Sequence, residues 1–303
     1  MKIFKNLNIT KKYQKSALAI GNFDGVHKGH QKVFYDAKKF LRKKKIKLGV
    51  LTFDPLPFLF FNKKIKNFRI TDNKEKSRLL GKNNINFVIE QKFNLKFSKI
   101  NAYNFLSKII REKIRPQYIF VSNNFRFGNK REGDVKLLKL LEKKYNYKII
   151  NPPTLKKKNK TISSSLIRKL LADGKLNLAN NYLNRNWSIE GVVKKGRNMG
   201  KKIGFPTCNI DIENYVIARP GVYAVKVNIL NSNKILKGIA NLGYRPTFNQ
   251  KKILLEVNIF NFSRNLYNKK LTVEFVNFIR GERKFKNIDQ LRKQIQKDIK
   301  VAK

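Results

Sequence analysis

The stretch Gly21-Asn22-Phe23-Asp24-Gly25-Val26-His27-Lys28-Gly29-His30 organises the first part of the chain. It follows an apolar run, Ala17 to Ile20, that predicts a buried strand, and it precedes apolar residues at helical spacing. The glycines of this stretch therefore lie at a strand-to-helix turn, together with the only two histidines of the chain. Free N–H groups and the positive end of the helix dipole suit phosphate at such a turn.

The two histidines are three residues apart, which places them on one side of the first helical turn. Imidazole groups there can stabilise charge on a phosphate, and Gly29 leaves room for a ligand to approach the backbone. Each feature alone is explained better by an ordinary turn, because lone histidines and glycine-rich βα turns are common. Together, with histidine absent elsewhere, they predict an anion site.

Composition allows one large domain or two of ordinary size in these 303 residues. The formal net charge of +50 favours polyanions: nucleic acid, anionic membranes or phosphorylated substrates. The excess is mostly lysine spread along the chain, and Lys, Asn and Ile have A/T-rich codons. A low-GC genome would produce the same bias without a function, so we favour that explanation and expect no specific nucleic-acid partner.

The single cysteine, Cys208, excludes an intramolecular disulfide and fits a reducing cytoplasm, where we expect the protein to be located. No metal site can be built from Cys and His alone. Residues 1–15 lack the apolar core of a signal peptide. The longest apolar stretch, Val50 to Phe61, carries Asp54 and two prolines, so we expect no membrane span.

Short apolar runs alternate with amphipathic segments from Ala17 to Asn151, a pattern typical of a parallel sheet with helices on its faces. The predicted strands are Ala17 to Ile20, Ile46 to Phe53, Phe87 to Ile89, Tyr118 to Val121 and Tyr147 to Ile150. The predicted helices are His30 to Lys43, Lys74 to Lys82, Ala102 to Glu112 and Asp134 to Lys144.

Two further polar segments are candidates for ligand contact. Residues 122–134 follow a predicted strand and offer amides, arginines and rings to a nucleotide or flavin, although an ordinary βα loop explains them equally well. Residues 161–168 place hydroxyl groups at a helix start with Arg168 one turn later. A plain serine N-cap is the usual explanation, and a second anion site is the alternative. The pattern of the following segment, Leu170 to Asn184, is typical of helical structure.

From Asn186 the segments shorten and alternate, which predicts a small antiparallel barrel or sandwich. Its predicted strands are Trp187 to Val193, Gly221 to Leu230, Ile235 to Leu242, Ile253 to Phe262 and Leu271 to Phe278, followed by a helix at Ile288 to Ala302. The glycine-punctuated basic loop of residues 196–204 could wrap phosphates. Thr207 and Asn209 would face one way on an extended segment, and their oxygens suit Mg²⁺ bound with a nucleotide. A hairpin loop with ordinary polar residues is the simpler explanation.

Taken in order, these motifs resemble those of the prokaryotic bifunctional riboflavin kinase/FMN adenylyltransferases. Residues 21–30 resemble G-x-F-D-G-V-H-x-G-H, whereas a bare H-x-G-H would indicate only the wider adenylyltransferase and class I aminoacyl-tRNA synthetase superfamily. Residues 122–134 resemble G-x-(D/N)-F-R-F-G-x-x-R-x-G-D, residues 162–168 I-S-S-T-x-I-R, and residues 196–209 the kinase signature G-R-x-L-G-F-P-T-A-N. Residues 219–224, 238–248, 255–262 and 280–285 match later family segments.

The chain departs from the family pattern at several positions. Leu56 and Asn258 replace histidines, and Asn261 replaces an aspartate, so one activity could be weakened. Ser165 replaces a threonine and keeps its hydroxyl, and Cys208 replaces an alanine. Ser122 stands where a glycine is usual, and Lys201 stands where an arginine is usual.

The resemblance implies an α/β, Rossmann-like nucleotidyltransferase domain at residues 1–184 and a riboflavin kinase domain at residues 185–303, the latter a small antiparallel β-barrel with a terminal helix. The kinase would convert riboflavin and ATP to FMN, and the adenylyltransferase would join AMP from a second ATP to FMN, giving FAD and pyrophosphate. The implied partners are these small molecules and Mg²⁺, with the protein a monomer or weak oligomer.

The resemblance also implies the site residues. Those for ATP in the first domain are Gly21, Phe23, His27, Gly29, His30, Ser164, Ser165 and Arg168, with both histidines catalytic. Those for flavin are Asn124, Phe125, Arg126 and Arg280. Gly204, Thr207 and Asn209 would bind ATP in the kinase, the last two holding Mg²⁺, and Glu256 would be the base; alone, Glu256 is better explained as a solvent-facing strand residue.

Two alternatives stay open. A different adenylyltransferase, acting on a pantetheine, nicotinate or lipid-head-group phosphate, explains His27 to His30 and leaves the barrel motifs unused. A non-enzymatic, basic RNA- or DNA-binding protein explains the charge and nothing else.

Overall fold

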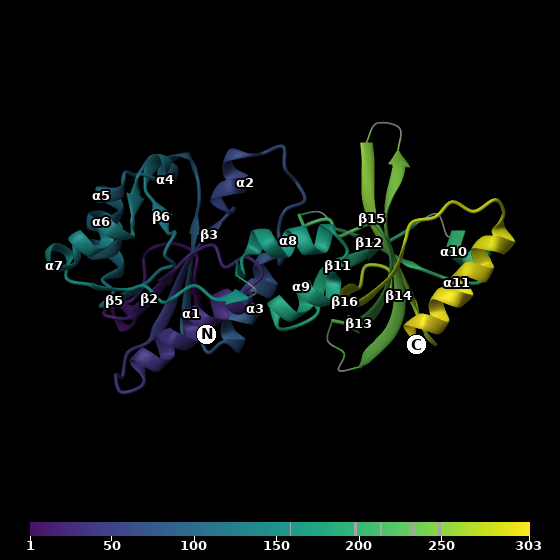
Figure 1. Ribbon diagram of the computed structural model, residues 1–303, viewed down its shortest axis with the longest axis horizontal. Helices are drawn as coiled ribbons and strands as arrows, with labels where there is room; N and C mark the ends of the chain where they lie inside the picture. Colours follow the sequence, from purple (N-terminus) through teal and green to yellow (C-terminus); the bar gives the residue numbers. More distant parts are fainter. Residues whose placement is uncertain (158, 197–198, 213, 231, 233, 248–249) are drawn as a thin grey trace. The chain divides into compact units, whose positions relative to one another are not determined.

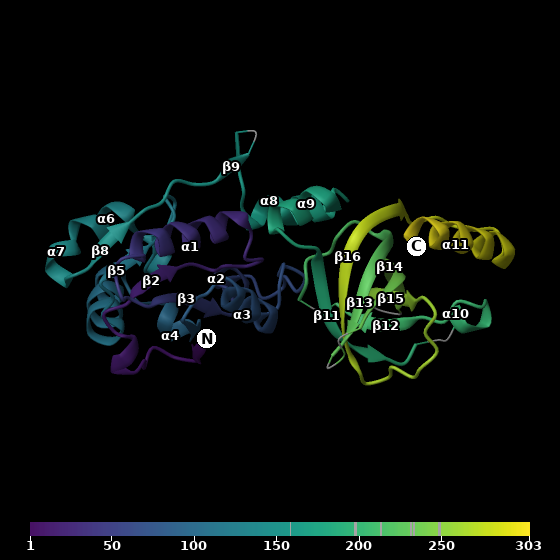
Figure 2. The same ribbon diagram turned by 90° about the horizontal axis from the view of Figure 1, so that it is seen from below.

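The computed structural model describes residues 1–157, 159–196, 199–212, 214–230, 232, 234–247 and 250–303. Its contacts divide the chain into two compact units (Figures 1 and 2). Unit 1 comprises Met1–Ile65 and Asn73–Ser163, and unit 2 comprises Lys66–Asp72 and Ser164–Lys303. The boundary between activities at residues 184 and 185 stays a prediction, because contacts do not report where an activity ends.

A six-stranded sheet forms the centre of unit 1, with the order β1-β4-β3-β2-β5-β8 and every pairing parallel. The strands are β1 (Lys2–Phe4), β2 (Ala17–Ile20), β3 (Leu48–Asp54), β4 (Phe87–Lys92), β5 (Tyr118–Phe120) and β8 (Lys148–Ile150). The predicted parallel sheet is confirmed. Strand β1 was not predicted, because its three residues carry no sustained apolar run.

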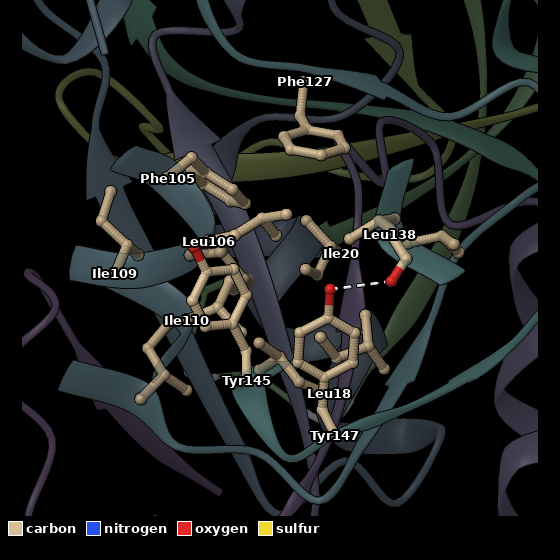
Figure 3. Packing of buried hydrophobic residues seen from close by; sticks show 14 of the residues in the cluster. Leu18, Ile20, Phe105, Leu106, Ile109, Ile110, Phe127, Leu138, Tyr145 and Tyr147 are labelled. Carbon is tan, nitrogen blue, oxygen red and sulfur yellow. Dashed lines mark hydrogen bonds between the residues drawn. The ribbon is translucent and has the colours of Figure 1, made fainter. Parts of the chain in front are cut away.

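Helices cover both faces of this sheet (Figure 2). Side chains alternate along β2, so Ala17 and Ala19 pack with α1 (Lys28–Leu41) and α3 (Asn73–Lys82), while Leu18 and Ile20 face the other way. Figure 3 shows that second face, where Leu18 and Ile20 meet side chains of the π-helical segment η2 (Phe105–Ile114). Burial on both faces explains why every residue of β2 is apolar.

The remaining elements of unit 1 are short and mostly lie in loops. They are η1 (Lys11–Tyr13), α2 (Pro57–Phe61), α4 (Leu95–Ser98), α5 (Ala102–Asn104), β6 (Arg126–Phe127), η3 (Asn129–Arg131), β7 (Gly133–Asp134), α6 (Val135–Leu140), α7 (Glu142–Tyr145), β9 (Lys156–Lys157) and β10 (Lys160–Thr161).

The strand order places a topological switch point between β2 and β5. The chain adds β3 and β4 on one side of β2 and then returns to build β5 and β8 on the other. Ligands bind in such sheets beyond the carboxyl ends of the strands at the switch point. The turn after β2 and the polar segment after β5 both begin there, so the topology supports both predictions of ligand contact in unit 1.

Unit 2 contains a closed antiparallel barrel with the order β11-β12-β15-β14-β13-β16, which confirms the predicted barrel (Figure 1). Its strands are β11 (Trp187–Lys194), β12 (Cys208–Asp211), β13 (Gly221–Ile229), β14 (Ile235–Thr247), β15 (Gln250–Ile259) and β16 (Lys270–Gly281). The short helix α10 (Met199–Lys202) precedes β12, and α11 (Ile288–Ala302) packs against β13, β14 and β16, with the bounds predicted for it. Strand β12 was not predicted.

The segment predicted as helical, Leu170 to Asn184, is mostly helical but is interrupted. Two helices occupy this region, α8 (Ser164–Ala172) and α9 (Leu176–Leu183). Gly174 between them has a φ of +74°, a left-handed conformation that ends the first helix. Among the described residues, no helix is long and apolar enough to cross a membrane.

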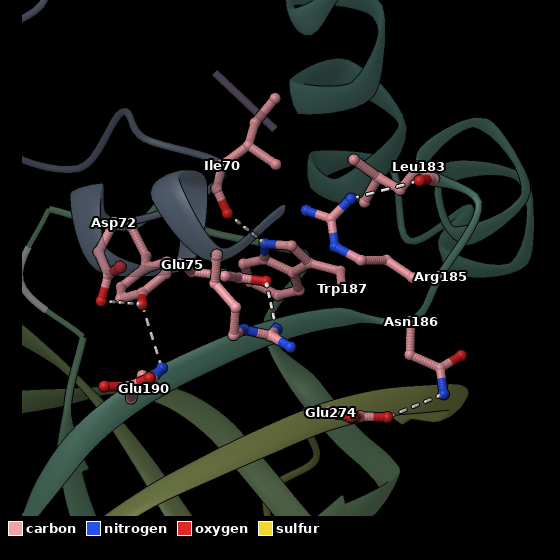
Figure 4. Close-up of polar contacts among 11 residues, drawn as sticks. Ile70, Asp72, Glu75, Leu183, Arg185, Asn186, Trp187, Glu190 and Glu274 are labelled. Atoms are coloured by element: carbon pink, nitrogen blue, oxygen red, sulfur yellow. Dashed lines mark hydrogen bonds and ion pairs between the residues drawn. The ribbon is translucent and has the colours of Figure 1, made fainter. Parts of the chain in front are cut away.

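Residues 66–72 come from the sequence that precedes α3, yet they pack within unit 2. Arg69 forms a parallel bridge with Tyr215. The indole Nε1 of Trp187 donates to the carbonyl of Ile70 at 3.0 Å (Figure 4). The Tyr215 hydroxyl donates to Asp72 Oδ2 at 3.1 Å. Because these partners are more than a hundred residues apart, the local pattern of the sequence gave no sign of this docking.

Candidate active sites

His27 and His30 form one compact unit at the start of α1. His27 is the N-cap, and its Nδ1 accepts a hydrogen bond from the His30 backbone N–H at 3.4 Å. The two rings stack with centroids 3.6 Å apart and planes inclined by 20°. An accepting Nδ1 places the proton of neutral His27 on Nε2. The predicted pairing of the histidines on one side of the helix start is thus observed.

Burial, and next the neighbouring His27, hold the pKa of His30 well below its ordinary value near 6.5. The imidazole of His30 is therefore neutral at neutral pH. Its buried Nδ1 has no hydrogen-bond partner among the described residues. A neutral His30 can contact phosphate oxygens beside the stacked His27 ring without the cost of two stacked cations.

Phe23 and Gly21 shape this turn from within. The buried Phe23 ring contacts the edge of His30, with centroids 5.1 Å apart, and also Phe34. A side chain at residue 21 would meet the Phe23 ring at 3.2 Å. Their predicted contact with ATP stays a prediction, and for Phe23 it would have to use the main chain because the ring is buried.

The turn also contains two non-glycine residues in the left-handed region. Phe23 has a φ of +50° and Val26 a φ of +39°, and Val26 is fully buried. Such a conformation is unusual for a β-branched residue and costs about 1–3 kcal/mol. The surrounding structure must therefore hold the turn in place.

Gly29 allows a close approach of the chain itself. A Cβ there would lie 2.8 Å from the carbonyl oxygen of Ile162 and 3.0 Å from the His27 ring. The expectation was room for a ligand, and the space beside Gly29 is filled by protein atoms instead. This contact places Ile162 against the first turn of α1, within unit 1.

Ser164, Ser165 and Arg168 belong to α8 in unit 2. The guanidinium of Arg168 lies over the Phe68 ring, 3.7 Å from its centroid, and Nε donates to the Phe68 carbonyl at 2.8 Å. These contacts orient Arg168, and its role toward ATP remains a prediction.

Asn124, Phe125 and Arg126 line a hollow of about 440 Å³ after β5. Asn124 Oδ1 accepts from the Ser122 hydroxyl at 2.9 Å, and Arg126 pairs with Asp134 at 3.5 Å. The hydrogen bond from the Leu137 N–H lowers the pKa of Asp134, which caps α6. The structure thus brings the three predicted flavin contacts of unit 1 to one surface.

A chain of phenylalanine rings leads from this hollow along the carboxyl edge of the sheet, and the sequence analysis missed it. Successive ring centroids lie 5.2–6.5 Å apart, and the members are Phe125, Phe127, Phe105, Phe97, Phe53, Phe93, Phe60 and Phe61. The abundance of phenylalanine after β3 and β4 was the available signal. It could not show that the rings touch.

In unit 2 the predicted kinase residues face one another across two strands. Asn209 of β12 is directly opposite Glu256 of β15, and Asn241 of β14 is opposite Glu256 on its other side. Leu255 and Val257 are fully buried, so the half-buried Glu256 projects from the opposite face of β15. Directly opposed side chains share a face, with Cβ atoms about 4.5–5.5 Å apart.

The side-chain oxygens of Thr207, Asn209 and Glu256 are of the kind that a hard cation binds. Asn209 is buried, and its Oδ1 has no hydrogen-bond partner among the described residues, so it can serve as a ligand. Thr207 lies two residues earlier, and Gly204 takes a φ of +88° at the end of the loop. No cluster of three His, Cys, Asp or Glu side chains that could hold a metal exists in the described parts of the chain. This donor set suits Mg²⁺, which binds few protein ligands together with substrate phosphates.

Two of the residues that depart from the family pattern, Asn258 and Asn261, lie at or just after β15. Asn258 donates from Nδ2 to the Pro206 carbonyl at 2.7 Å, next to Thr207. Asn261 has a φ of +53° after β15, a conformation that asparagine tolerates. Arg197 of the kinase signature and Phe248 of a later motif lie outside the described residues.

Arg280, which the sequence predicts near the flavin, forms a bidentate ion pair in unit 2. Its Nε and Nη2 donate to the buried carboxylate of Asp298 at 2.9 and 2.8 Å, tying β16 to α11. Gln294 also donates to Asp298. Its predicted contact with flavin is untested, and its visible role is structural.

The comparisons with known proteins agree with this two-part architecture. The FAD synthetase family profile matches residues 9–166, and the riboflavin kinase profile matches residues 183–303. The bifunctional riboflavin kinase/FMN adenylyltransferase of Buchnera aphidicola from Schizaphis graminum is 39% identical over 100% of this chain and 98% of the relative. That of Escherichia coli K12 is 34% identical over 100% and 97%.

One solved structure matches over nearly the whole length. A crystal structure described as a macrolide-efflux protein from Streptococcus pneumoniae has a TM-score of 0.87 at 27% identity, covering 99% of this chain and 97% of that chain. A nucleotidyltransferase sheet joined to a closed barrel defines a two-domain transferase. The chain belongs to the bifunctional riboflavin kinase/FMN adenylyltransferase family, and both catalytic domains of that family are present.

Proposed function

We propose that this protein phosphorylates riboflavin to FMN with ATP and then adenylylates FMN with a second ATP, releasing FAD and pyrophosphate. The observation that supports the proposal is that each unit brings together its own set of predicted phosphate-site residues. His27 and His30 stack at a helix start in unit 1, and Asn209 opposes Glu256 in the barrel of unit 2. A different adenylyltransferase would leave the second of these unused.

In the kinase reaction, the 5′-hydroxyl oxygen of riboflavin attacks the γ-phosphorus of ATP. The bond from that phosphorus to the β,γ-bridging oxygen breaks, and ADP leaves. Glu256 would accept the hydroxyl proton, since such a reaction needs a base near the attacking oxygen. Thr207 and Asn209 would hold Mg²⁺, whose charge would offset that of the phosphates. The hydrogen bond from Asn258 would keep the Thr207 segment against β15.

In the adenylyl transfer, a phosphate oxygen of FMN attacks the α-phosphorus of ATP. The bond from that phosphorus to the α,β-bridging oxygen breaks, and pyrophosphate leaves. The FMN phosphate is already anionic, so no strong base is required. His27 and His30 would donate to the phosphate oxygens, together with the backbone N–H groups of α1 and with Ser164, Ser165 and Arg168.

The flavin would occupy the hollow formed by Asn124, Phe125 and Arg126. The chain of phenylalanine rings beside it supports this placement, because the flavin ring system is flat and can stack on aromatic side chains. A cytoplasmic location is inferred from the single cysteine, since a reducing compartment suits a free thiol. We expect the protein to be a monomer or a weak oligomer. We expect no specific nucleic-acid partner.

The test is a chromatographic assay of purified protein with riboflavin, ATP and Mg²⁺, in which FMN should appear first and FAD second. Replacing both histidines, His27→Ala with His30→Ala, should abolish FAD and spare FMN. Glu256→Gln should slow FMN formation by about 10²–10⁴-fold and spare FAD formation from added FMN. Absence of both products from the wild-type protein would refute the proposal.

A further inference from the structure

Lys76 of α3 is almost fully buried, at 2% exposure. Lysine is almost never buried unless it has partners. Its Nζ donates to the Thr52 hydroxyl at 3.2 Å, and that hydroxyl donates to the carbonyl of Asn22 at 3.1 Å. Thr52 itself is fully buried near the carboxyl end of β3. Two buried side chains are thus connected in series to the main chain of the turn after β2.

The anchored residue precedes the strained part of that turn. Asn22 is followed by Phe23, and Val26 lies three residues further on, both in the left-handed region. On the other side of the turn, Gln31 Nε2 donates to the Val26 carbonyl at 2.8 Å. The turn is therefore held at both ends by side chains of neighbouring elements.

The position of the turn sets the direction of α1 and of its N-cap. His27 follows Val26 directly, and its ring stacks on His30. Hydrogen-bond donors stabilise charge that develops on phosphate only when they are fixed in place before the reaction. A shift of about 1 Å in such a group can cost about 10²-fold in rate.

We propose that Lys76 and Thr52 are positioning residues for adenylyl transfer, because their hydrogen bonds hold the Asn22 carbonyl and so the turn that presents His27, His30 and the start of α1 to ATP. The inference rests on the proposed function of unit 1 and adds two residues to it. Neither residue needs to touch a substrate.

The primary test is Thr52→Val, which keeps the shape of the side chain and removes the hydroxyl that links Lys76 to Asn22. We expect kcat for FAD formation from FMN and ATP to fall about 10²-fold, while the KM for ATP changes less than threefold. FMN formation from riboflavin by the same protein should be unchanged, which shows that the preparation is folded and active. Thr52→Ser, which restores the hydroxyl, should recover most of the FAD activity.

Lys76→Met provides the second variant, because it leaves the bond from Thr52 to Asn22 in place. We expect an intermediate loss of kcat, about tenfold, again with little change in KM. Ser77→Ala is the matched control: Ser77 is the buried neighbour on α3, but its hydroxyl donates to Glu90 at 2.8 Å and not toward the turn. FAD formation by this control should match the wild-type rate.

The outcomes separate the inference from the function on which it rests. If the wild-type protein makes no FAD, the proposed function fails. If it makes FAD and Thr52→Val does so within twofold, the positioning role is wrong. A rise in KM without a fall in kcat would also overturn it, since that indicates lost ground-state binding. Should Thr52→Val fail to fold, unchanged kcat in Lys76→Met decides against the inference.

Discussion

The guanidinium of Arg168 lies over the ring of Phe68, 3.7 Å from its centroid, and its Nε donates to the Phe68 carbonyl. The two residues are 100 positions apart in the sequence. Arg168 is the arginine that the family resemblance assigns to the ATP phosphates. Its orientation is therefore set by a segment, residues 66–72, that had no assigned role in the sequence.

Phe68→Leu should weaken FAD formation by loosening Arg168. A cation–π contact of this kind contributes about 1 kcal/mol, so kcat/KM for ATP should fall about fivefold in a coupled assay of pyrophosphate release. Arg168→Lys should cost more, because lysine lacks the planar fork that stacks and donates together. Tyr35→Leu, an exposed aromatic change on α1, is the control. Unchanged FAD formation in Phe68→Leu would contradict this role.

The lowered pKa of His30 predicts that the folded protein loses stability in acid. Its pKa is lowered in the folded protein, so below its unfolded value near 6.5 the unfolded chain binds a proton that the folded chain does not. The free energy of unfolding should therefore be fully retained above about pH 6.5 and fall as the pH drops further, with a slope of at most about 1.4 kcal/mol per pH unit from this group. Urea unfolding followed between pH 5 and 8 tests it. His30→Gln should flatten the acid limb, and identical pH profiles would exclude His30 as its source.

Asn209→Ala should reduce FMN formation at least tenfold and raise the Mg²⁺ concentration needed for half-maximal rate, because it removes the buried Oδ1 that has no other partner among the described residues. Cys208→Ala is the matched control next to it. Cys208 points to the other face of β12, and burial raises the pKa of its thiol, so it offers little thiolate. Equal Mg²⁺ dependence in the two variants would argue against Asn209 as a metal ligand.

Asn258→Ala should raise the KM for ATP in the kinase reaction up to about tenfold, since a hydrogen bond contributes about 0.5–1.5 kcal/mol and this one holds the Pro206 carbonyl beside Thr207. Asn258→His should retain most activity, because an imidazole N–H can donate to the same carbonyl. Initial rates of FMN formation at varied ATP measure both. An inactive histidine variant would show that the amide has a different task.

Asp298→Ala should destabilise unit 2 by about 3–5 kcal/mol, because it leaves the Arg280 guanidinium with its main partner removed at a site where the Arg280 side chain is 13% exposed. The double variant Arg280→Met with Asp298→Leu should recover much of that loss. Thermal unfolding of the barrel reports both changes. If Asp298→Ala melts with the wild type, the ion pair contributes little to the barrel.

Much of the fold could be predicted because its helices and strands follow from the pattern of residues that are close along the chain. The apolar run at Ala17 to Ile20 and the glycines after it indicate a strand, a turn and a helix within a few residues of one another. Helix α11 was located to the residue for the same reason. Strand β12 was missed because it is four residues long and its neighbours in the barrel come from distant sequence.

By itself the sequence determined the two kinds of domain, the pairing of His27 with His30 and the spacing of Thr207 and Asn209, because each depends on residues that are close along the chain. The tertiary structure decided that Ile162 fills the space beside Gly29, that Phe68 holds Arg168, and that buried Lys76 reaches the turn through Thr52. Those contacts arise where separate elements pack together, and no local periodicity encodes which distant atom meets which. Residues 21–30 therefore predict an anion site from the sequence. Only the packing shows which distant side chains hold that turn in place.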